Sequence, residues 1–191
     1  IDGSKSEMIR KLKAKGFESS PYDKEVLTGE FNGTEVNVYV LTNNNKVFRI
    51  ALEDVYVQDE HDIVARFNRL CHQFERNKKY VCYGDYTIPE GEDIEYEMYV
   101  NNKRYEAGYY QRPADTTAMY NEIKDLVSEI TNSGLESDAT EEQRLNWAEN
   151  VVEEMPMLKR LVWFRIEEEL GEYRIIMYYD NKYNRANGED L

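Results

Sequence analysis

Apolar residues near the start of the chain recur at helical spacing and then switch to the alternation of strands. Ser4 and Glu7 have the spacing of a helix capping box, and an apolar stripe follows them, so we predict a helix that ends near Gly16. Alternation then predicts three strands, at 25–31, 34–42 and 46–54. The turns between them are rich in asparagine, and strands joined by such short turns form an antiparallel meander.

The period changes after residue 58, where helical spacing predicts a long amphipathic helix from an N-cap at Asp59 to about Asn77. Alternation returns at 94–100, which predicts a strand, followed by a turn at Asn101-Asn102 and a return strand at 103–111. Further helices are predicted at about 116–131 and 140–154, and the final segment, 180–191, is predicted to be a polar surface tail.

A closing hairpin is predicted at 158–167 and 172–179, with its turn near Gly171. Both of its faces carry apolar side chains: Val162, Phe164, Ile166, Ile175 and Met177 on one face, and Leu161, Trp163, Ile176 and Tyr178 on the other. Strands that are apolar on both faces are typical of the centre of a sheet. We therefore expect this hairpin to join the two halves of the chain into one sheet.

These elements predict an α+β fold, in which antiparallel meanders and hairpins carry amphipathic helices on one face. The chain is interpreted as a single domain of 191 residues built from two structural units, 1–78 and 79–191. The helices at 59–77 and 116–131 align at an offset of 56 residues, and the turns Asn44-Asn45 and Asn101-Asn102 at an offset of 57. Internal duplication explains this match, and so does the chance likeness of two amphipathic helices.

Charge and composition narrow the function classes. Acidic residues number 38 and basic residues 24, so the net charge is −14, which disfavours nucleic acid and anionic membrane surfaces as partners. The sequence contains no run of 18 or more apolar residues, so we predict no membrane insertion. Because the chain begins at Ile1 instead of Met, we expect an upstream segment such as a signal peptide to have been removed, and hence a periplasmic or secreted protein.

Residues that commonly carry catalysis or bind metals are scarce. His61 and His72 lie on the same predicted helix but roughly 16 Å apart, too far to share one metal ion. Cys71 falls on the apolar stripe of that helix and is interpreted as a core residue, with a disulfide to Cys82 as the alternative. The sequence also lacks the common nucleotide-binding, serine-hydrolase and zinc-protease motifs. We predict no catalytic residue, no metal and no cofactor.

Acidic pairs keep one enzymatic alternative open. Glu95 and Glu97 would share a face of the predicted strand, and Glu167 to Glu169 lie together at the last hairpin. A glycosidase needs two carboxyl groups at a defined separation, so a carboxylate-dependent glycan hydrolase is the rival hypothesis.

Tyrosine is unusually frequent, with 16 residues. Several aromatic residues are predicted on strand faces away from the helices, and these are the candidate ligand-binding residues: Tyr39, Tyr99, Tyr110, Trp163 and Tyr178. Aromatic side chains with a polar tip are favoured at binding surfaces, although tyrosine also simply favours strands. We predict a non-enzymatic binding module for a protein, peptide or envelope component; a structural subunit of a larger assembly is a further alternative.

Two resemblances accompany this interpretation. The helix that ends at Gly16-Phe17, followed by a meander, resembles in element order the small α+β units of the β-lactamase-inhibitor-protein and PepSY-like groups, over the first 55 or so residues. The stretches 174–181 and 187–191 are similar to uncharacterised exported proteins of Gram-negative gut anaerobes. Both resemblances imply an exported protein, and the first also implies a non-enzymatic one. Neither supplies a catalytic residue.

Overall fold

A computed structural model describes residues 3–82, 84–112 and 160–181 of the chain. The described elements, in chain order, are α1 (Lys5–Lys13), β1 (Glu18–Ser19), β2 (Val26–Phe31), β3 (Thr34–Asn43), β4 (Lys46–Asp54), α2 (Glu60–Arg76), β5 (Tyr80–Val81), α3 (Ile94–Val100), β6 (Glu106–Gln111), β7 (Leu161–Glu169) and β8 (Glu172–Asp180). The strands form one antiparallel sheet in the order β1-β2-β3-β4-β8-β7-β6-β5. The predicted α+β fold is confirmed.

The terminal hairpin occupies the centre of the sheet, as its two apolar faces predicted. β8 pairs with β4 of the N-terminal meander, whereas β7 pairs with β6, so the hairpin joins strands from both halves of the chain. Its turn is at Leu170-Gly171, and both residues have a positive φ. Each outer edge of the sheet ends in a strand of two residues, β1 or β5. Such short edge strands offer little backbone for unwanted pairing.

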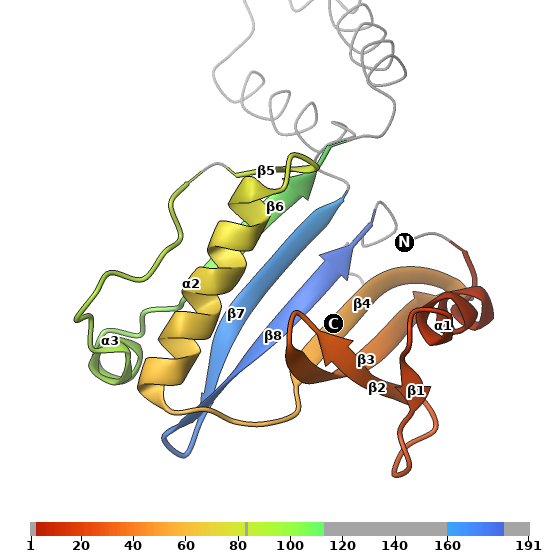
Figure 1. Ribbon diagram of the computed structural model, residues 1–191, viewed down its shortest axis with the longest axis horizontal. Coiled ribbons are helices and arrows are strands. Elements are labelled where there is room, and N and C mark those ends of the chain that lie inside the picture. Colours follow the sequence, from red (N-terminus) through yellow and green to blue (C-terminus); the bar gives the residue numbers. More distant parts are fainter. Residues whose placement is uncertain (1–2, 83, 113–159, 182–191) are drawn as a thin grey trace, which may run out of the picture.

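The hydrophobic core lies between one face of the sheet and the helices α1 and α2, which both cover that face (Figure 1). The long apolar stripe of α2 is buried there, as the pattern predicted; it includes Ile63, Phe67, Leu70, Cys71 and Phe74. The sheet contributes the inward-facing residues of its central strands, which include Val36, Val38, Leu52, Phe164 and Ile175. Burial of these side chains is the main contribution to folding.

The predicted helix starts are confirmed at α1 and α2. Ser4 accepts a hydrogen bond from the backbone N–H of Glu7, and the Glu7 side chain accepts one from the backbone of Ser4, which completes the capping box. Asp59 caps α2 by accepting from the N–H of Asp62.

The prediction of a strand at 94–100 is wrong, because these residues form the helix α3. Asp93 caps it by accepting from the N–H of Tyr96, and Asn101 ends it. The positive φ of Asn102 belongs to the end of this helix and not to a hairpin turn. The sequence match therefore pairs the hairpin turn Asn44-Asn45 with the helix end Asn101-Asn102, which are different local structures. The second hairpin that a duplication requires is absent from the described residues. The predicted helices 116–131 and 140–154 and residues 182–191 of the predicted tail lie outside them. Asp180 and Asn181 correct the start of that tail, because Asp180 ends β8 and Asn181 is buried.

The helices of the described ranges include none that is both long and apolar enough to span a lipid bilayer.

Candidate functional site

Four of the five predicted binding residues lie on the sheet face opposite α1 and α2. The strand register places Tyr39 beside Ala51, Ala51 beside Tyr178, and Tyr178 beside Trp163, in one row across four strands. Tyr110 on β6 pairs with Leu161, two residues from Trp163, and so lies on the same face. We call Tyr39, Tyr110, Trp163 and Tyr178 the aromatic face. All four side chains are half-buried, neither open to solvent nor part of the core.

The centre of the aromatic face is a stacked pair of rings held by an arginine. The rings of Trp163 and Tyr178 stack with their centroids 4.3 Å apart. The guanidinium of Arg49 lies 4.8 Å from the Tyr178 ring centroid and 5.6 Å from the Trp163 ring centroid. Such cation–π contacts on two rings at once restrict the arginine to one position.

Asp180 ties this cluster to the backbone of β8. Its carboxylate accepts two hydrogen bonds from Arg49, at 2.6 and 2.9 Å, and one from the indole Nε1 of Trp163, at 3.0 Å. The hydrogen bond to Asp180 raises the pKa of Arg49 above its already high value, against the opposing effect of burial. The cation therefore stays charged, and the orientations of the indole and the guanidinium are coupled through one carboxylate.

A second polar network surrounds Tyr39. Its hydroxyl donates to Glu53 at 2.9 Å, and Arg174 donates to the other carboxylate oxygen of Glu53 at 3.0 Å. Burial raises the pKa of Tyr39, and the hydrogen bond to Glu53 raises it further, so the phenol remains a neutral donor. Side chains across β3, β4 and β8 are thus interlocked on this face.

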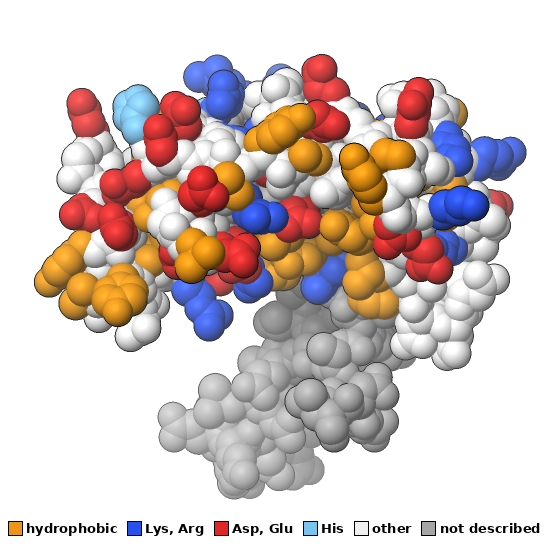
Figure 2. Space-filling model, turned by 90° about the horizontal axis from the view of Figure 1, so that it is seen from below, with side chains coloured by type: hydrophobic (Ala, Val, Ile, Leu, Met, Phe, Trp, Pro, Cys, Tyr) orange, Lys and Arg blue, Asp and Glu red, His pale blue; other side chains and the backbone are white. Residues whose placement is uncertain are grey.

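Tyr99 does not belong to the aromatic face, which corrects the prediction that placed it on a strand. It lies on α3, and its side chain is 87% exposed. Two neighbours on the same helix, Tyr96 and Val100, are also exposed, and Figure 2 shows apolar side chains gathered over α3 at the left end of the molecule. Glu95 and Glu97 lie on this helix as well. Because two residues span about 200° of an α-helix, they point to opposite sides and not to one shared strand face.

A groove of about 660 Å³ lies between α3 and the end of β7. Its walls are α3, the segment 102–104, the start of β6 and residues 165–168 of β7; we call it the α3 groove. Tyr99 and Met98 line it from the helix, and Arg165 lines it from the sheet. The Arg165 Nε is buried and has no hydrogen-bond partner among the described residues, although its Nη2 pairs with Glu167. Sequence reasoning missed this groove because it expected a strand where α3 lies.

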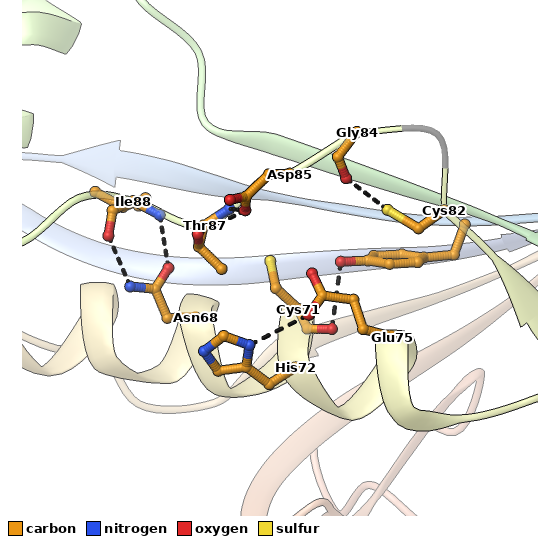
Figure 3. Close-up of polar contacts among 10 residues, drawn as sticks. Asn68, Cys71, His72, Glu75, Cys82, Gly84, Asp85, Thr87 and Ile88 are labelled. Atoms are coloured by element: carbon orange, nitrogen blue, oxygen red, sulfur yellow. Dashed lines mark hydrogen bonds and ion pairs between the residues drawn. The ribbon is translucent and has the colours of Figure 1, made fainter.

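Cys71 and Cys82 are both free thiols, so the disulfide alternative is not formed. Figure 3 shows them between α2 and the segment after β5, where the Cys82 thiol donates to the Gly84 carbonyl at 2.6 Å. Burial raises the pKa of Cys71 to about 11, which keeps its thiol protonated at neutral pH. His72 is exposed and contacts Glu75 on its own helix. Within the described ranges no group of three or more His, Cys, Asp or Glu side chains is placed to hold a metal ion.

The segment after β5 is fixed to α2 by one amide. The Asn68 side chain donates to the Ile88 carbonyl at 2.9 Å and accepts from the Ile88 N–H at 2.7 Å, as a neighbouring strand would (Figure 3). This contact holds in place the segment that leads into α3 and so helps to position one wall of the α3 groove.

Comparisons with known protein families, with curated proteins and with solved structures find no match to this chain.

Proposed function

We propose that the chain is a non-enzymatic, exported binding module whose aromatic face contacts a protein, peptide or envelope component. The observation that carries the proposal is the cluster of Arg49, Trp163 and Tyr178 on the sheet face away from the helices. The periplasmic or secreted location rests on the sequence resemblance to exported proteins.

The chemistry of this cluster supports a binding role. Tryptophan, tyrosine and arginine are the residue types that contribute most binding energy at protein interfaces. Here the hydrogen bonds of Asp180 hold Trp163 and Arg49 in place before any partner arrives. Ordering side chains on binding costs about 0.5–1.5 kcal/mol for each one, and a cluster that is already ordered avoids much of that cost.

The acids on this face support binding over glycan hydrolysis. Glu53 and Asp180 accept hydrogen bonds from Tyr39 and Trp163, and each is also held by an arginine, Arg174 or Arg49. Carboxylates committed to such ion pairs orient their neighbours, whereas a glycosidase needs a carboxyl group that remains able to donate a proton.

Site-specific photo-crosslinking tests the proposal. A photoreactive phenylalanine replaces Tyr39 or Tyr110 in the full chain, and the protein is exposed to an extract of the cell envelope. We expect a covalent adduct of one defined mass from both positions. The same residue at Tyr22 or Tyr56, two exposed tyrosines outside the aromatic face, should give none. Equal labelling at all four positions, or no adduct at the aromatic face, contradicts the proposal.

A matched pair of substitutions supplies the affinity test. We expect Trp163→Ala to weaken capture of the crosslinked partner at least about tenfold, as removal of an interface hot spot does. Tyr56→Ala should leave capture unchanged. The melting temperature of each variant is measured together with its affinity. If Trp163→Ala is unfolded under the conditions of the binding assay, its loss of capture reflects lost stability and contradicts a binding role for Trp163.

A further inference from the structure

We propose that the α3 groove binds an extended basic peptide segment, which adds as a short strand beside the end of β7. The groove is a site separate from the aromatic face, although the two meet at Arg165, whose guanidinium lies 6.0 Å from the Trp163 ring centroid. Four features of this end of the sheet support the inference: an unpaired strand edge, an excess of negative charge, exposed apolar side chains and a strained turn residue.

The strand edge is the first feature. The Ile166 N–H donates to the Tyr105 carbonyl, so it points towards β6, and the N–H of Glu168, two residues later, points the same way. β6 begins at Glu106, opposite Arg165, and no described strand continues beside residues 167–169 on that side. On the other side Glu168 is opposite Tyr173, whose N–H and carbonyl both bond to Gln58 instead. The backbone of Glu168 therefore faces the groove with its donor and acceptor free of the β7–β8 ladder.

Charge is the second feature. Two cations of the groove are already neutralised, because Lys103 pairs with Glu92 and Arg165 with Glu167. The remaining charged residues of the lining are Glu95, Glu106, Glu168 and Arg104, so acids exceed bases by three to one. A ligand that carries lysine or arginine side chains complements this excess, and the net charge of −14 attracts it over longer distances.

Apolar contact area is the third feature. Tyr99 and Met98 supply it inside the groove, and the exposed side chains of Tyr96 and Val100 extend it along α3. A strand added to a sheet edge presents alternate side chains to its surroundings, so every second residue of the peptide would face these apolar groups.

Leu170, at the turn just beyond the groove, is the fourth feature. It is 95% exposed and has a φ of 56°, a conformation that glycine and asparagine adopt far more readily than leucine. A large apolar residue in this conformation lowers stability, and at this exposure it buries almost no surface in compensation. An apolar contact between Leu170 and the bound peptide would offset this loss of stability.

Peptide binding to the full chain, measured by fluorescence anisotropy, tests the proposal. The probes are fluorescein-labelled peptides of about nine residues that alternate Lys or Arg with Val or Tyr, a length that spans an ordinary strand. Each has an acidic counterpart in which Glu replaces the basic residue. We expect at least one basic peptide to bind at about 50 mM NaCl at least about tenfold more tightly than its counterpart. If no basic peptide exceeds its counterpart, the proposal is wrong.

Paired charge variants locate the binding site. The double variant Glu95→Gln/Glu106→Gln should weaken peptide binding by about fivefold or more, because it removes two groove carboxylates. The control is Glu30→Gln/Glu35→Gln, a pair of exposed acids that face each other across β2 and β3, and it changes the net charge by the same amount. Equal weakening in the two double variants would show attraction to the overall charge and overturn the site.

Backbone methylation of the peptide tests the strand mode. N-methylation at alternate residues removes one row of donors and should weaken binding by at least about tenfold in one of the two registers, because only one edge of an added strand faces β7. An equal effect of both registers would overturn strand addition. A Trp163→Ala protein that loses its envelope partner but keeps peptide binding would separate this site from the aromatic face.

Discussion

Arg66 on α2 and Asp54 at the end of β4 form a two-bonded ion pair inside the core, with Nε–Oδ2 and Nη2–Oδ1 distances of 2.5 Å each. Their side chains are only 4% and 2% exposed. Asp54 also accepts a longer contact, 3.4 Å, from the backbone N–H of Ile175 on β8. The pair therefore joins the helix to the two strands through which the meander and the terminal hairpin meet.

Removing one partner of this pair should be strongly destabilising. We expect Arg66→Met to lower the free energy of unfolding by about 3–5 kcal/mol, because it leaves the Asp54 charge buried without a counter-charge. The double variant Arg66→Met/Asp54→Leu should recover most of that loss, since both charges are then gone. Urea denaturation followed by circular dichroism measures each value. Arg69→Met, on the exposed side of the same helix, is the control and should change stability little.

Phe17 packs over the backbone of β2 at Gly29, which leaves no room for a side chain there. A Cβ at Gly29 would lie 2.6 Å from the Phe17 Cδ1. We expect Gly29→Ala to cost about 1–3 kcal/mol through this overlap. Gly108→Ala, also in a strand, would meet only the Leu161 Cδ1 at 3.8 Å and should be neutral or slightly stabilising. Thermal melts of both variants check the difference, and similar losses would contradict the packing explanation.

The fold was predictable where the hydrophobic period was long and unambiguous. The meander, α1, α2 and the terminal hairpin all follow from such patterns, and β4 was predicted with its observed limits. The alternation of Ile94, Tyr96 and Met98 wrongly predicted a strand, because a seven-residue helix buries few side chains and shows no clear helical period. Only Ile94 is fully buried, and Met98, four residues later, shares its side of the helix. Asp93, as an N-cap, was the signal that indicated a helix.

The candidate site was predictable in part, for a similar reason. Two-residue alternation places Tyr39, Trp163 and Tyr178 on one face of their strands, and the observed register brings them into one row. The sequence gives no indication that Arg49 and Asp180, 131 residues apart in the chain, meet beside Trp163. That contact depends on which strand lies beside β4, and local patterns do not encode strand order.

The buried thiol of Cys71 should make stability fall at alkaline pH. The folded pKa is about 11 against an ordinary value of 9.0, so between these values the folded chain keeps a proton that the unfolded chain has lost. The stabilisation is therefore complete below about pH 9 and is lost as the pH rises towards 11, by about 3 kcal/mol at most. The urea midpoint, measured from pH 8 to 11, checks this trend.

Cys71→Val is the control for that titration, because it keeps an apolar side chain and removes the ionisable group. Its urea midpoint should decline less between pH 9 and 11 than that of the wild type. Burial also raises the pKa of Tyr179 without any part played by Cys71, so this contribution is the same in both proteins and cancels. The raised pKa of Tyr109 depends on burial first and on Cys71 second, so the comparison reports Cys71 together with its effect on Tyr109. Parallel declines in the two proteins would show that Cys71 does not titrate in this range.

Leu170 offers a test in which stability and binding should change in opposite directions. Leu170→Asn places a residue that favours a positive φ into the turn Leu170-Gly171, so we expect the protein to gain about 0.5–1 kcal/mol of stability. Asn44→Leu, at the first position of the equivalent turn between β3 and β4 (φ 48°), is the reverse substitution and should lose a similar amount. Differential scanning calorimetry measures both.

If the exposed leucine contributes to the α3 groove, Leu170→Asn should also weaken binding of the basic peptide, whereas Asn44→Leu should not. A stabilised Leu170→Asn protein with unchanged peptide affinity would remove Leu170 from the proposed site.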